Sequence, residues 1–398
     1  MHGSGQEIYM LRRCRSRKSN PALPKDGAGE NSALSGLHVA LFKRRLRLKR
    51  RYLRKLIADI PLDHLTSLGL ESKFDDLAVA RNNSRMVIGV SATAEDGRYF
   101  VLKAGSDVMS RRVLAVETAR LEELKSDLRG SPWLDYLPRR IVVRLDDPVP
   151  FVVDESLSST TIQDLARRDG LDDVLVSNAI SVIGELKREA ATVVIAGPAL
   201  IEGTIVRRVD LIRQQWGKAM LLKGTDSSLS ILKDELVKSM EGRRVEVGWQ
   251  HGDYSLGNVL VDSTLQRVTG IIDWGGSAPH ELIGVDPALM ALSAHGFHES
   301  GDVNSSVLRI VEVLARRLEA SEEDHRLIER LKCAWPATQD LSLMQGVIIT
   351  WIYHVAHLYD IRSPNVLAPG HWVQRRVSGV LETIMRAGVS NLHVDAPM

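Results

Sequence analysis

Cysteine is scarce in this sequence, and long apolar runs are absent from it. Cys14 and Cys333 are the only two cysteines in 398 residues, which excludes a disulfide framework. Neither a Cys-x-x-Cys nor a His-Glu-x-x-His motif occurs, so the usual zinc signatures are also excluded. No apolar run reaches the roughly 18 residues that a membrane-spanning helix needs. We therefore expect a soluble, cytoplasmic protein of a reducing compartment.

Composition is otherwise ordinary. Hydrophobic residues make up 44% and charged residues 26% of the chain, which excludes collagen-like and wholly disordered proteins. The length exceeds that of one typical domain and predicts two or three domains.

Charge is unevenly distributed. Residues 1–58 contain 15 lysines and arginines but three acids, whereas the rest of the chain contains 37 bases and 47 acids. Residues 1–36 can bury little apolar surface and are predicted to form a disordered arm. Bases alternate with leucines over residues 37–60, where a basic amphipathic helix is predicted. Its apolar face consists of Phe42, Leu46, Leu53 and Ile57.

The basic helix has two interpretations. Its segment 41–57 could lie peripherally on an anionic membrane, where acidic lipids attract lysine and arginine, or contact another polyanion. Alternatively, it is a solvated helix that packs on the body of the protein through its leucines. We expect no specific nucleic-acid partner.

Strand patterns dominate the first part of the body. β-rich runs at 86–92 and 98–104 flank the turn signal Asp96-Gly97 and predict a hairpin. A helix is expected over 110–129 from its apolar spacing. Two further strands are expected at 140–145 and 149–153.

The pattern then becomes mostly helical. Helices are expected near 161–168, 172–192, 203–222 and 228–241. We therefore predict an α+β protein with two lobes. The smaller, β-rich N-terminal lobe covers residues 61–153, and the larger, mainly helical C-terminal lobe covers residues 154–398.

Two charged residues of the N-terminal lobe indicate a binding function. Lys103 lies late in a predicted strand, and Glu117 lies on the apolar stripe of the following helix. A carboxylate on a buried stripe needs a partner, because its desolvation is otherwise costly. A buried pair with Lys103 would present an ammonium at a fixed position for nucleotide phosphates. Alternatively, Glu117 is an ordinary surface residue and Lys103 lies on an edge strand.

The most informative segment is 249–274, W-Q-H-G-D-Y-S-L-G-N-V-L-V-D-S-T-L-Q-R-V-T-G-I-I-D-W. Strands are expected at 258–262 and 268–274, and a hairpin centred on the link between them places Asn258 directly opposite Asp273. An amide oxygen and a carboxylate so placed can share a hard cation. Magnesium favours such oxygen ligands together with substrate phosphates, so a Mg²⁺ site is predicted.

Asp253 lies five residues before Asn258, on the loop that leads into the first of these strands. It could take the proton of an attacking hydroxyl beside a metal-bound phosphate. Gly252 and Gly257 allow the backbone conformations that such a loop needs. The alternative is a surface hairpin with incidental polar residues, which requires several spacings to coincide by chance.

The motif H-G-D-x-x-x-x-N followed by I-D-W resembles the aminoglycoside phosphotransferase and choline-kinase-like family, within the protein-kinase-like fold. The resemblance covers roughly residues 75–295. It implies that Asp253 is the catalytic base and that Asn258 and Asp273 bind magnesium. It also implies that Lys103 binds phosphate and that Glu117 is its partner on the helix.

Position within the family pattern implies further nucleotide contacts. Ser84 lies in a stretch that stands where the nucleotide loop is expected, although this stretch lacks glycine. Asp154 and Ser156 follow a predicted strand at the expected hinge between the lobes, where their backbone would meet adenine. Asp286 stands just before a predicted helix and is interpreted as a structural cap.

Two groups near the C-terminus allow more than one interpretation. His354 and His357 share a helical face, but no third metal ligand accompanies them, so satisfied or exposed histidines are expected. An aromatic group could wall an acceptor pocket or pack in the core. It consists of Trp351, Tyr353, Tyr359 and Trp372.

These observations predict an ATP-dependent phosphotransferase, with Mg²⁺ as cofactor, that acts on the hydroxyl of a small molecule. A nucleotide-binding pseudokinase or a membrane-associated scaffold is the alternative, although a scaffold needs no complete set of Asp253, Asn258 and Asp273. Protein-kinase activity is disfavoured, because Gly252 replaces the arginine of the H-R-D motif and no clear A-P-E-like segment follows. An antibiotic, a choline-like alcohol, a sugar and an envelope precursor all stay open as acceptors.

Overall fold

The computed structural model describes residues 79–80, 88–93, 99–105, 108–156, 160–219, 225–262, 264, 266–299, 301–335, 340–361 and 372–388. All of them belong to one of the two units into which the chain divides, Leu56–Met398. The predicted arm at 1–36, the predicted basic helix at 37–60 and Ser84 lie outside the described residues.

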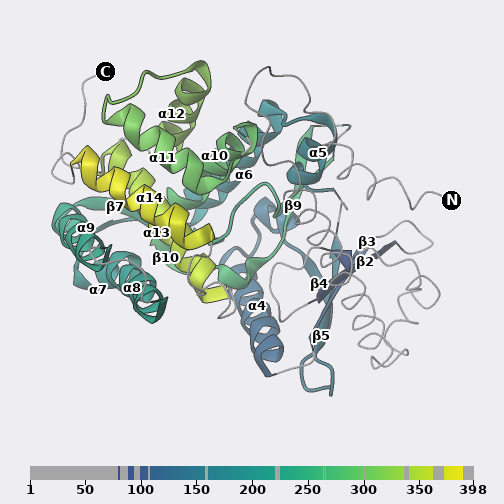
Figure 1. Ribbon diagram of the computed structural model, residues 1–398. Helices are drawn as coiled ribbons and strands as arrows, with labels where there is room; N and C mark the ends of the chain where they lie inside the picture. Colours follow the sequence, from purple (N-terminus) through teal and green to yellow (C-terminus); the bar gives the residue numbers. More distant parts are fainter. Residues whose placement is uncertain are drawn as a thin grey trace, which may run out of the picture. The chain divides into compact units, whose positions relative to one another are not determined.

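An antiparallel sheet of five strands, in the order β1-β2-β3-β5-β4, forms the N-terminal lobe (Figure 1). Its strands are β1 (Val79–Ala80), β2 (Ile88–Thr93), β3 (Tyr99–Ala104), β4 (Arg139–Arg144) and β5 (Phe151–Ser156). The predicted hairpin is confirmed, because β2 and β3 pair from Ile88 opposite Ala104 to Thr93 opposite Tyr99. β5 lies between β3 and β4 and ends later than predicted.

The helix after this hairpin is α4 (Val108–Asp127), which confirms the helix predicted over 110–129. Its buried stripe contains Leu114, Glu117, Leu121 and Leu124. These residues recur at intervals of three and four, so one helical face carries them all. Packing of the leucines therefore draws the carboxylate of Glu117 into the interior, on the side where α4 contacts β5.

The C-terminal lobe is mainly helical, as predicted (Figure 1). Its helices are α5 (Ile162–Asp169), α6 (Asp173–Ala190), α7 (Pro198–Ile201), α8 (Arg207–Ala219), α9 (Thr225–Met240), α10 (Val285–His298), α11 (Val303–Leu314), α12 (Glu322–Ala334), α13 (Leu343–Ile361) and α14 (Trp372–Ala387). A π-helical turn, Glu202–Val206, joins α7 to α8. Among the helices described, none is both long and apolar enough to cross a membrane.

Five strands lie among these helices. A sheet with the order β10-β7-β6 consists of β6 (Thr192–Ile195), β7 (Arg244–Gln250) and β10 (Ala278–Leu282). A separate hairpin consists of β8 (Val259–Asp262) and β9 (Arg267–Ile271). The three-stranded sheet was not predicted. It nevertheless positions the functional motif, because β7 ends directly before His251.

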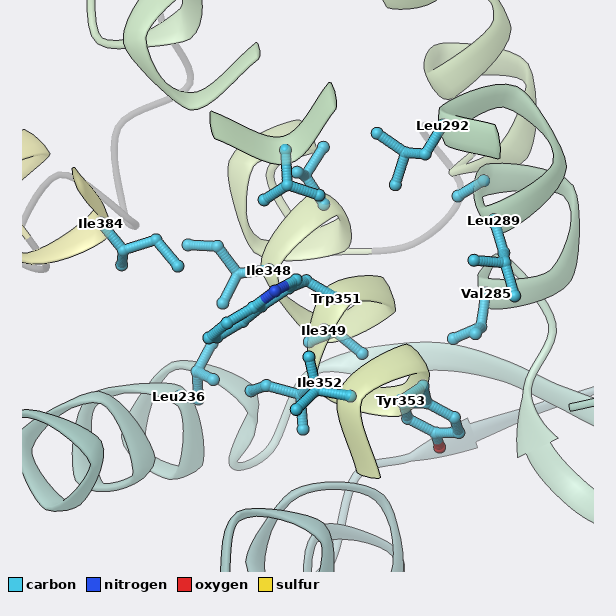
Figure 2. Close-up of a cluster of buried hydrophobic side chains, with 14 of the residues drawn as sticks. Leu236, Val285, Leu289, Leu292, Ile348, Ile349, Trp351, Ile352, Tyr353 and Ile384 are labelled. Atoms are coloured by element: carbon cyan, nitrogen blue, oxygen red, sulfur yellow. The ribbon is translucent and has the colours of Figure 1, made fainter. Parts of the chain in front are cut away.

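A large hydrophobic core joins α9, α10, α13 and α14 (Figure 2). Trp351 is fully buried there, and its indole N–H donates to Oδ1 of Asn304 at 3.1 Å. Tyr353 and Tyr359 are buried as well, so core packing is confirmed for these three aromatic residues. Truncation of such a large buried side chain to alanine typically costs about 3–5 kcal/mol. The α+β, two-lobe prediction agrees with the described architecture.

Candidate active site

Lys103 on β3 lies in a buried ionic cluster. Its Nζ is 2.6 Å from Oε1 of Glu117 and 2.8 Å from Oδ1 of Asp273. Oδ2 of Asp154 lies 4.0 Å from the same nitrogen. The side chains of Lys103 and Glu117 are 11% and 6% exposed, so water screens their contact weakly. The predicted contact between the two is confirmed, and the alternative of a surface glutamate is wrong.

A second cation, Arg140 on β4, holds the same carboxylates. Its Nε and Nη2 donate to the two carboxylate oxygens of Asp154 at 2.8 and 3.0 Å. Nη2 also lies 3.5 Å from Oε2 of Glu117. A bidentate guanidinium–carboxylate contact is among the stronger charged pairs in proteins. Sequence reasoning missed Arg140, since nothing in its local pattern distinguishes it from the neighbouring Arg139.

The expected hinge position of Asp154 and Ser156 needs correction. Both residues lie inside β5, because the strand continues past the predicted end at Val153. The backbone of Asp154 stands in register with Val101 on one side and Arg140 on the other. The backbone of Asp154 is therefore flanked by paired strands on both sides, and its side chain binds Arg140. Ser156 is the last residue of the strand, opposite Tyr99.

The cluster keeps Lys103 charged. Burial by itself lowers the pKa of its ammonium, but Asp273, Glu117 and Asp154 together raise that pKa above its ordinary value. The same contact acts on the partner. Burial raises the pKa of Asp273, whereas Lys103 holds it below the ordinary range. The N-terminal lobe thus presents a fixed positive charge beside the I-D-W segment of the C-terminal lobe.

His251 ties the H-G-D loop to the segment after β9. Its Nδ1 accepts a hydrogen bond from the backbone N–H of Asp253 at 3.2 Å, and its Nε2 lies 2.8 Å from the carbonyl oxygen of Ile272. A carbonyl oxygen only accepts, so these two contacts assign the proton to Nε2. The imidazole therefore fixes the backbone before Asp253 to the backbone before Asp273.

Gly252 occupies a position that no other residue fits. Its φ is +86°, and a Cβ built there would lie 2.4 Å from the carbonyl oxygen of Gly276. Left-handed backbone and close approach to another chain segment both favour glycine. This is the position at which the H-R-D motif carries arginine, and the packing here leaves no space for a side chain.

Asn258 directly contacts Asp253. Its Nδ2 donates to the backbone oxygen of Asp253 at 2.8 Å and to Oδ2 of the same residue at 3.1 Å. These two acceptors define which end of the amide is nitrogen. Among the described residues, none donates a hydrogen bond to Oδ1 of Asn258. That oxygen can therefore bind a cation.

Asp273 does not stand directly opposite Asn258, which corrects the predicted register. The backbone N–H of Ile272 donates to the carbonyl oxygen of Asn258 at 2.9 Å, so Asn258 faces Ile272. The physical reason is that the hairpin turns earlier than predicted and contains a register shift between Leu260 and Val261. Strand β9 accordingly ends at Ile271, before the acid.

Backbone conformation, rather than strand pairing, aims Asp273. Its φ of 66° and ψ of 55° are left-handed, and it precedes the short 3-10 helix η4 (Trp274–Gly276). Such a conformation is unfavourable for a residue with a side chain and is concentrated at functional sites. Here it takes the carboxylate out of the strand alternation and toward Lys103.

Asp286 fixes the H-G-D loop and is not a helix cap. It is fully buried one residue inside α10, whose N-cap is Gly284. Its Oδ2 accepts from the backbone N–H of His251 at 2.7 Å, and its Oδ1 accepts from that of Gly252 at 3.1 Å. Its structural role is as expected, but the partner is the loop.

His357 is the further site residue that the sequence did not reveal. It lies on α13, with Nε2 3.7 Å from Oδ2 of Asp253. Burial would raise the pKa of Asp253, but His357 and His354 hold it below its ordinary value. The shared helical face of His354 and His357 was visible in the sequence. No local signal connected that face with a loop some hundred residues earlier.

The oxygen donors fit magnesium bound together with phosphate. Asp253 and Asp273 repel each other electrostatically, and both pKa values lie below the ordinary one, so two ionised carboxylates adjoin. In the part of the chain that the structure describes, no group of three or more His, Cys, Asp or Glu could hold a metal alone. Magnesium commonly takes one or two protein oxygens and completes its shell with water and substrate phosphates. Asn258 and Asp273 are suited to that arrangement.

Comparisons with known proteins give a family match and several similar solved structures. Residues 197–302 match the family model described as the phosphotransferase enzyme family. No curated protein is detectably similar to the chain in sequence.

Three solved structures illustrate the structural likeness. Aminoglycoside phosphotransferase APH(2'')-Ib with ADP bound is 12% identical, with a TM-score of 0.45 over 81% of this chain and 98% of that one. Amicoumacin kinase hAmiN in complex with AMP-PNP, Ca²⁺ and Ami is 11% identical, with a TM-score of 0.46 over 83% of this chain and 96% of that one. Macrolide 2'-phosphotransferase MphH from Brachybacterium faecium is 14% identical, with a TM-score of 0.44 over 80% and 96%. The family match covers the segment that contains Asp253, Asn258 and Asp273, and it is in line with the resemblance that the motifs indicate.

Proposed function

We propose that this chain is a small-molecule kinase that transfers the γ-phosphate of ATP to an acceptor hydroxyl. The observation that carries the proposal is the 2.8 Å contact between Lys103 and Asp273. It brings the candidate phosphate-binding cation of one lobe to the candidate metal ligand of the other. Asp253 and Asn258 adjoin the same segment through His251 and Ile272.

Each residue has a distinct role in the proposed reaction. Asp253 takes the proton of the acceptor hydroxyl as that oxygen bonds to the γ-phosphorus, and the bond to the bridging oxygen of ADP breaks. Lys103 binds phosphate oxygens, and Glu117 keeps its ammonium in place. Asn258 and Asp273 would hold Mg²⁺, which supplies charge neutralisation for the phosphates when bound. Ser84 and Ser156 are further proposed nucleotide contacts.

Two isosteric variants separate these roles. Asp253→Asn removes the base, so Mg-ATP should still bind while turnover falls by about 10²–10⁴-fold, the usual worth of general base catalysis. Asp273→Asn removes a charge from the metal site, so Mg-ATP binding should weaken as well. Asp262→Asn, at the end of β8 in the same hairpin, is the matched control, because its Oδ1 accepts local hydrogen bonds such as that from the backbone N–H of Thr264.

Calorimetric titration with Mg-ATP and an ATP-consumption screen measure the two effects. The screen uses a panel of aminoglycosides, macrolides, choline-like alcohols and sugars. Full activity of Asp253→Asn would refute the assigned base. Mg-ATP binding without transfer to any acceptor would instead favour the nucleotide-binding pseudokinase.

We also propose that the basic segment 41–57 holds the enzyme peripherally at anionic membranes. Its excess of lysine and arginine among leucines supports this. Deletion of residues 1–58 should then abolish sedimentation with phosphatidylserine vesicles and leave turnover intact. Vesicle binding by the full chain that is absent, or that does not weaken with salt, would contradict this proposal.

A further inference from the structure

Helix α4 carries Glu117, and two cations from different strands bind its carboxylate. Oε1 accepts from Nζ of Lys103 on β3 at 2.6 Å. Oε2 lies 3.5 Å from Nη2 of Arg140 on β4. The side chains of Glu117 and Arg140 are 6% and 2% exposed, so water screens this second contact weakly as well. Loss of either cation therefore leaves the carboxylate with the other one.

Arg140 also reaches the backbone of α4. Its Nη1 donates to Oγ1 of Thr118 at 2.6 Å, and that hydroxyl donates to the carbonyl oxygen of Leu114, one turn earlier, at 2.7 Å. The guanidinium thus contacts two consecutive residues of the helix, Glu117 and Thr118. Because the second of these contacts continues to the backbone, it constrains the helix and not only a flexible side chain.

Asp154 on β5 fixes the orientation of Arg140. Its two carboxylate oxygens accept from Nε at 2.8 Å and from Nη2 at 3.0 Å. A planar guanidinium can hold this fork and still direct Nη1 and Nη2 toward α4, whereas the ammonium of a lysine is a single point charge. Arg140 thus connects β4, β5 and α4 through protein groups alone.

Helix α4 also contacts the C-terminal lobe. It packs against η4, the short helix that follows Asp273 directly. A Cβ on Gly275 would lie 3.9 Å from Cβ of Glu117, so the two segments are in ordinary van der Waals reach of each other. A displacement of α4 would therefore change where Glu117 stands relative to both Lys103 and the segment of Asp273.

Lys103 and Arg140 differ in what the proposed reaction asks of them. Lys103 binds phosphate oxygens in that reaction, and it now shares its ammonium between Glu117 and Asp273. The partners of Arg140 have no part in metal binding or proton transfer in the proposed reaction. Its contacts can therefore persist while those of Lys103 change.

We propose that Arg140 is a positioning residue, which holds α4 and Glu117 in place independently of Lys103 and thereby keeps the Lys103 ammonium where nucleotide phosphates meet it. The attachment of α4 is a property of the protein alone, whereas its effect on nucleotide rests on the proposed function. Arg140 exchanges no atom and acts through Glu117. A misplacement of about 1 Å at such a site can cost up to about 10²-fold in turnover.

Hydrogen exchange of the α4 backbone tests the attachment without a ligand. Arg140→Lys keeps the charge but cannot form the bidentate contact, and Lys103→Met removes the other cation. Exchange in α4 is measured against exchange in α10, a buried helix of the C-terminal lobe, because a general loss of stability accelerates both helices. Arg139→Gln is the matched control, since this neighbouring arginine is 73% exposed and lies 3.1 Å from Glu155.

Arg140→Lys should accelerate exchange in α4 relative to α10 by about 10-fold or more, because hydrogen bonds to charged groups are lost. Lys103→Met should accelerate it less, and Arg139→Gln should not change it. Equal acceleration of α4 and α10 in Arg140→Lys, or a larger effect in Lys103→Met, would overturn the proposal.

Calorimetric titration with Mg-ATP measures the consequence for nucleotide. Arg140→Lys should weaken Mg-ATP binding by about 10-fold, and the same substitution should have no further effect in Glu117→Gln, because Arg140 acts through that carboxylate. A purely structural arginine would lower stability and leave the affinity of the folded protein unchanged, so unchanged Mg-ATP binding in Arg140→Lys would contradict the proposed role. Absence of Mg-ATP binding in the parent protein would refute the proposed function instead, and the exchange of α4 would still decide the role of Arg140.

Discussion

Lys187 on α6 is a buried ammonium without a hydrogen-bond partner among the described residues. Its residue exposure is 3%. Burial lowers its pKa from 10.5 to about 7, and the attraction of Asp286 compensates only partly. Replacement of Lys187 by methionine, which has a similar shape and no charge, should therefore stabilise the protein near neutral pH.

The magnitude follows from the two pKa values. The difference between 10.5 and about 7 corresponds to about 5 kcal/mol of folding free energy. Between these pH values the unfolded chain binds more protons at this site than the folded protein does. Stability should therefore rise with pH across this window, while the cost is fully present below about pH 7. The figure is an upper bound, because water that enters the site reduces the cost of burial.

Urea unfolding between pH 6 and 10 measures this cost. Lys187→Met should be more stable than the parent by up to about 4 kcal/mol at pH 7, and the advantage should shrink toward pH 10. Lys332→Met is the control, because that lysine is 32% exposed and pairs with Glu329 on the same helix. A difference between Lys187→Met and the parent that does not change with pH would refute the reasoning. It would mean that the ammonium is solvated or paired in the folded protein.

Three further predictions concern the ionic cluster and the loop. Lys103→Ala and Glu117→Ala should each weaken Mg-ATP binding strongly. The double variant should bind Mg-ATP little worse than either single variant, because each substitution breaks the same ion pair. Additive losses of binding in calorimetry would show that the two residues act separately. Gly252→Ala should lower both stability and turnover, because backbone strain at positive φ adds to a clash between the new Cβ and Gly276. Gly130→Ala is the control, since Gly130 also has a positive φ but no atom lies within 4 Å of a Cβ there. Its free energy of unfolding, measured by thermal unfolding, should fall by only about 1 kcal/mol. Arg140→Met should lower the free energy of unfolding by about 3–5 kcal/mol in denaturant titration, because it leaves the buried carboxylates with one cation fewer. An unchanged free energy of unfolding would show that water solvates the cluster.

Local periodicity predicted those parts of the site that depend on one element at a time. The alternation of β3 and the apolar stripe of α4 fix where Lys103 and Glu117 point, and their contact follows because the two elements are adjacent in the chain. The helices near 161–168, 172–192, 203–222 and 228–241 were predicted for the same reason. Their boundaries depend on caps such as Thr161 and Asp172, whose side chains accept backbone N–H groups.

Pairing details and distant partners could not be predicted. Simple strand alternation would place Asn258 opposite Asp273. It fails here because the β8–β9 hairpin contains a register shift and because the backbone of Asp273 is left-handed. The sheet that holds β7 joins β6 and β10 from distant parts of the chain, so no short window contains its pattern. Asp286 and His357 reach the H-G-D loop only through packing of α10 and α13.

The charge balance of the cluster accounts for the contact between Lys103 and Asp273. Lys103 and Arg140 stand against Glu117, Asp154 and Asp273, which leaves one net negative charge. Arg140 contacts Glu117 and Asp154, so these two carboxylates keep a cation even when Lys103 turns elsewhere. Under the proposed function, Asp273 would hold the magnesium ion of Mg-ATP, whose charge would replace that of Lys103 beside this carboxylate. The ammonium of Lys103 would then be available to a phosphate oxygen while it stays bonded to Glu117, and Arg140 would keep Glu117 and Asp154 neutralised.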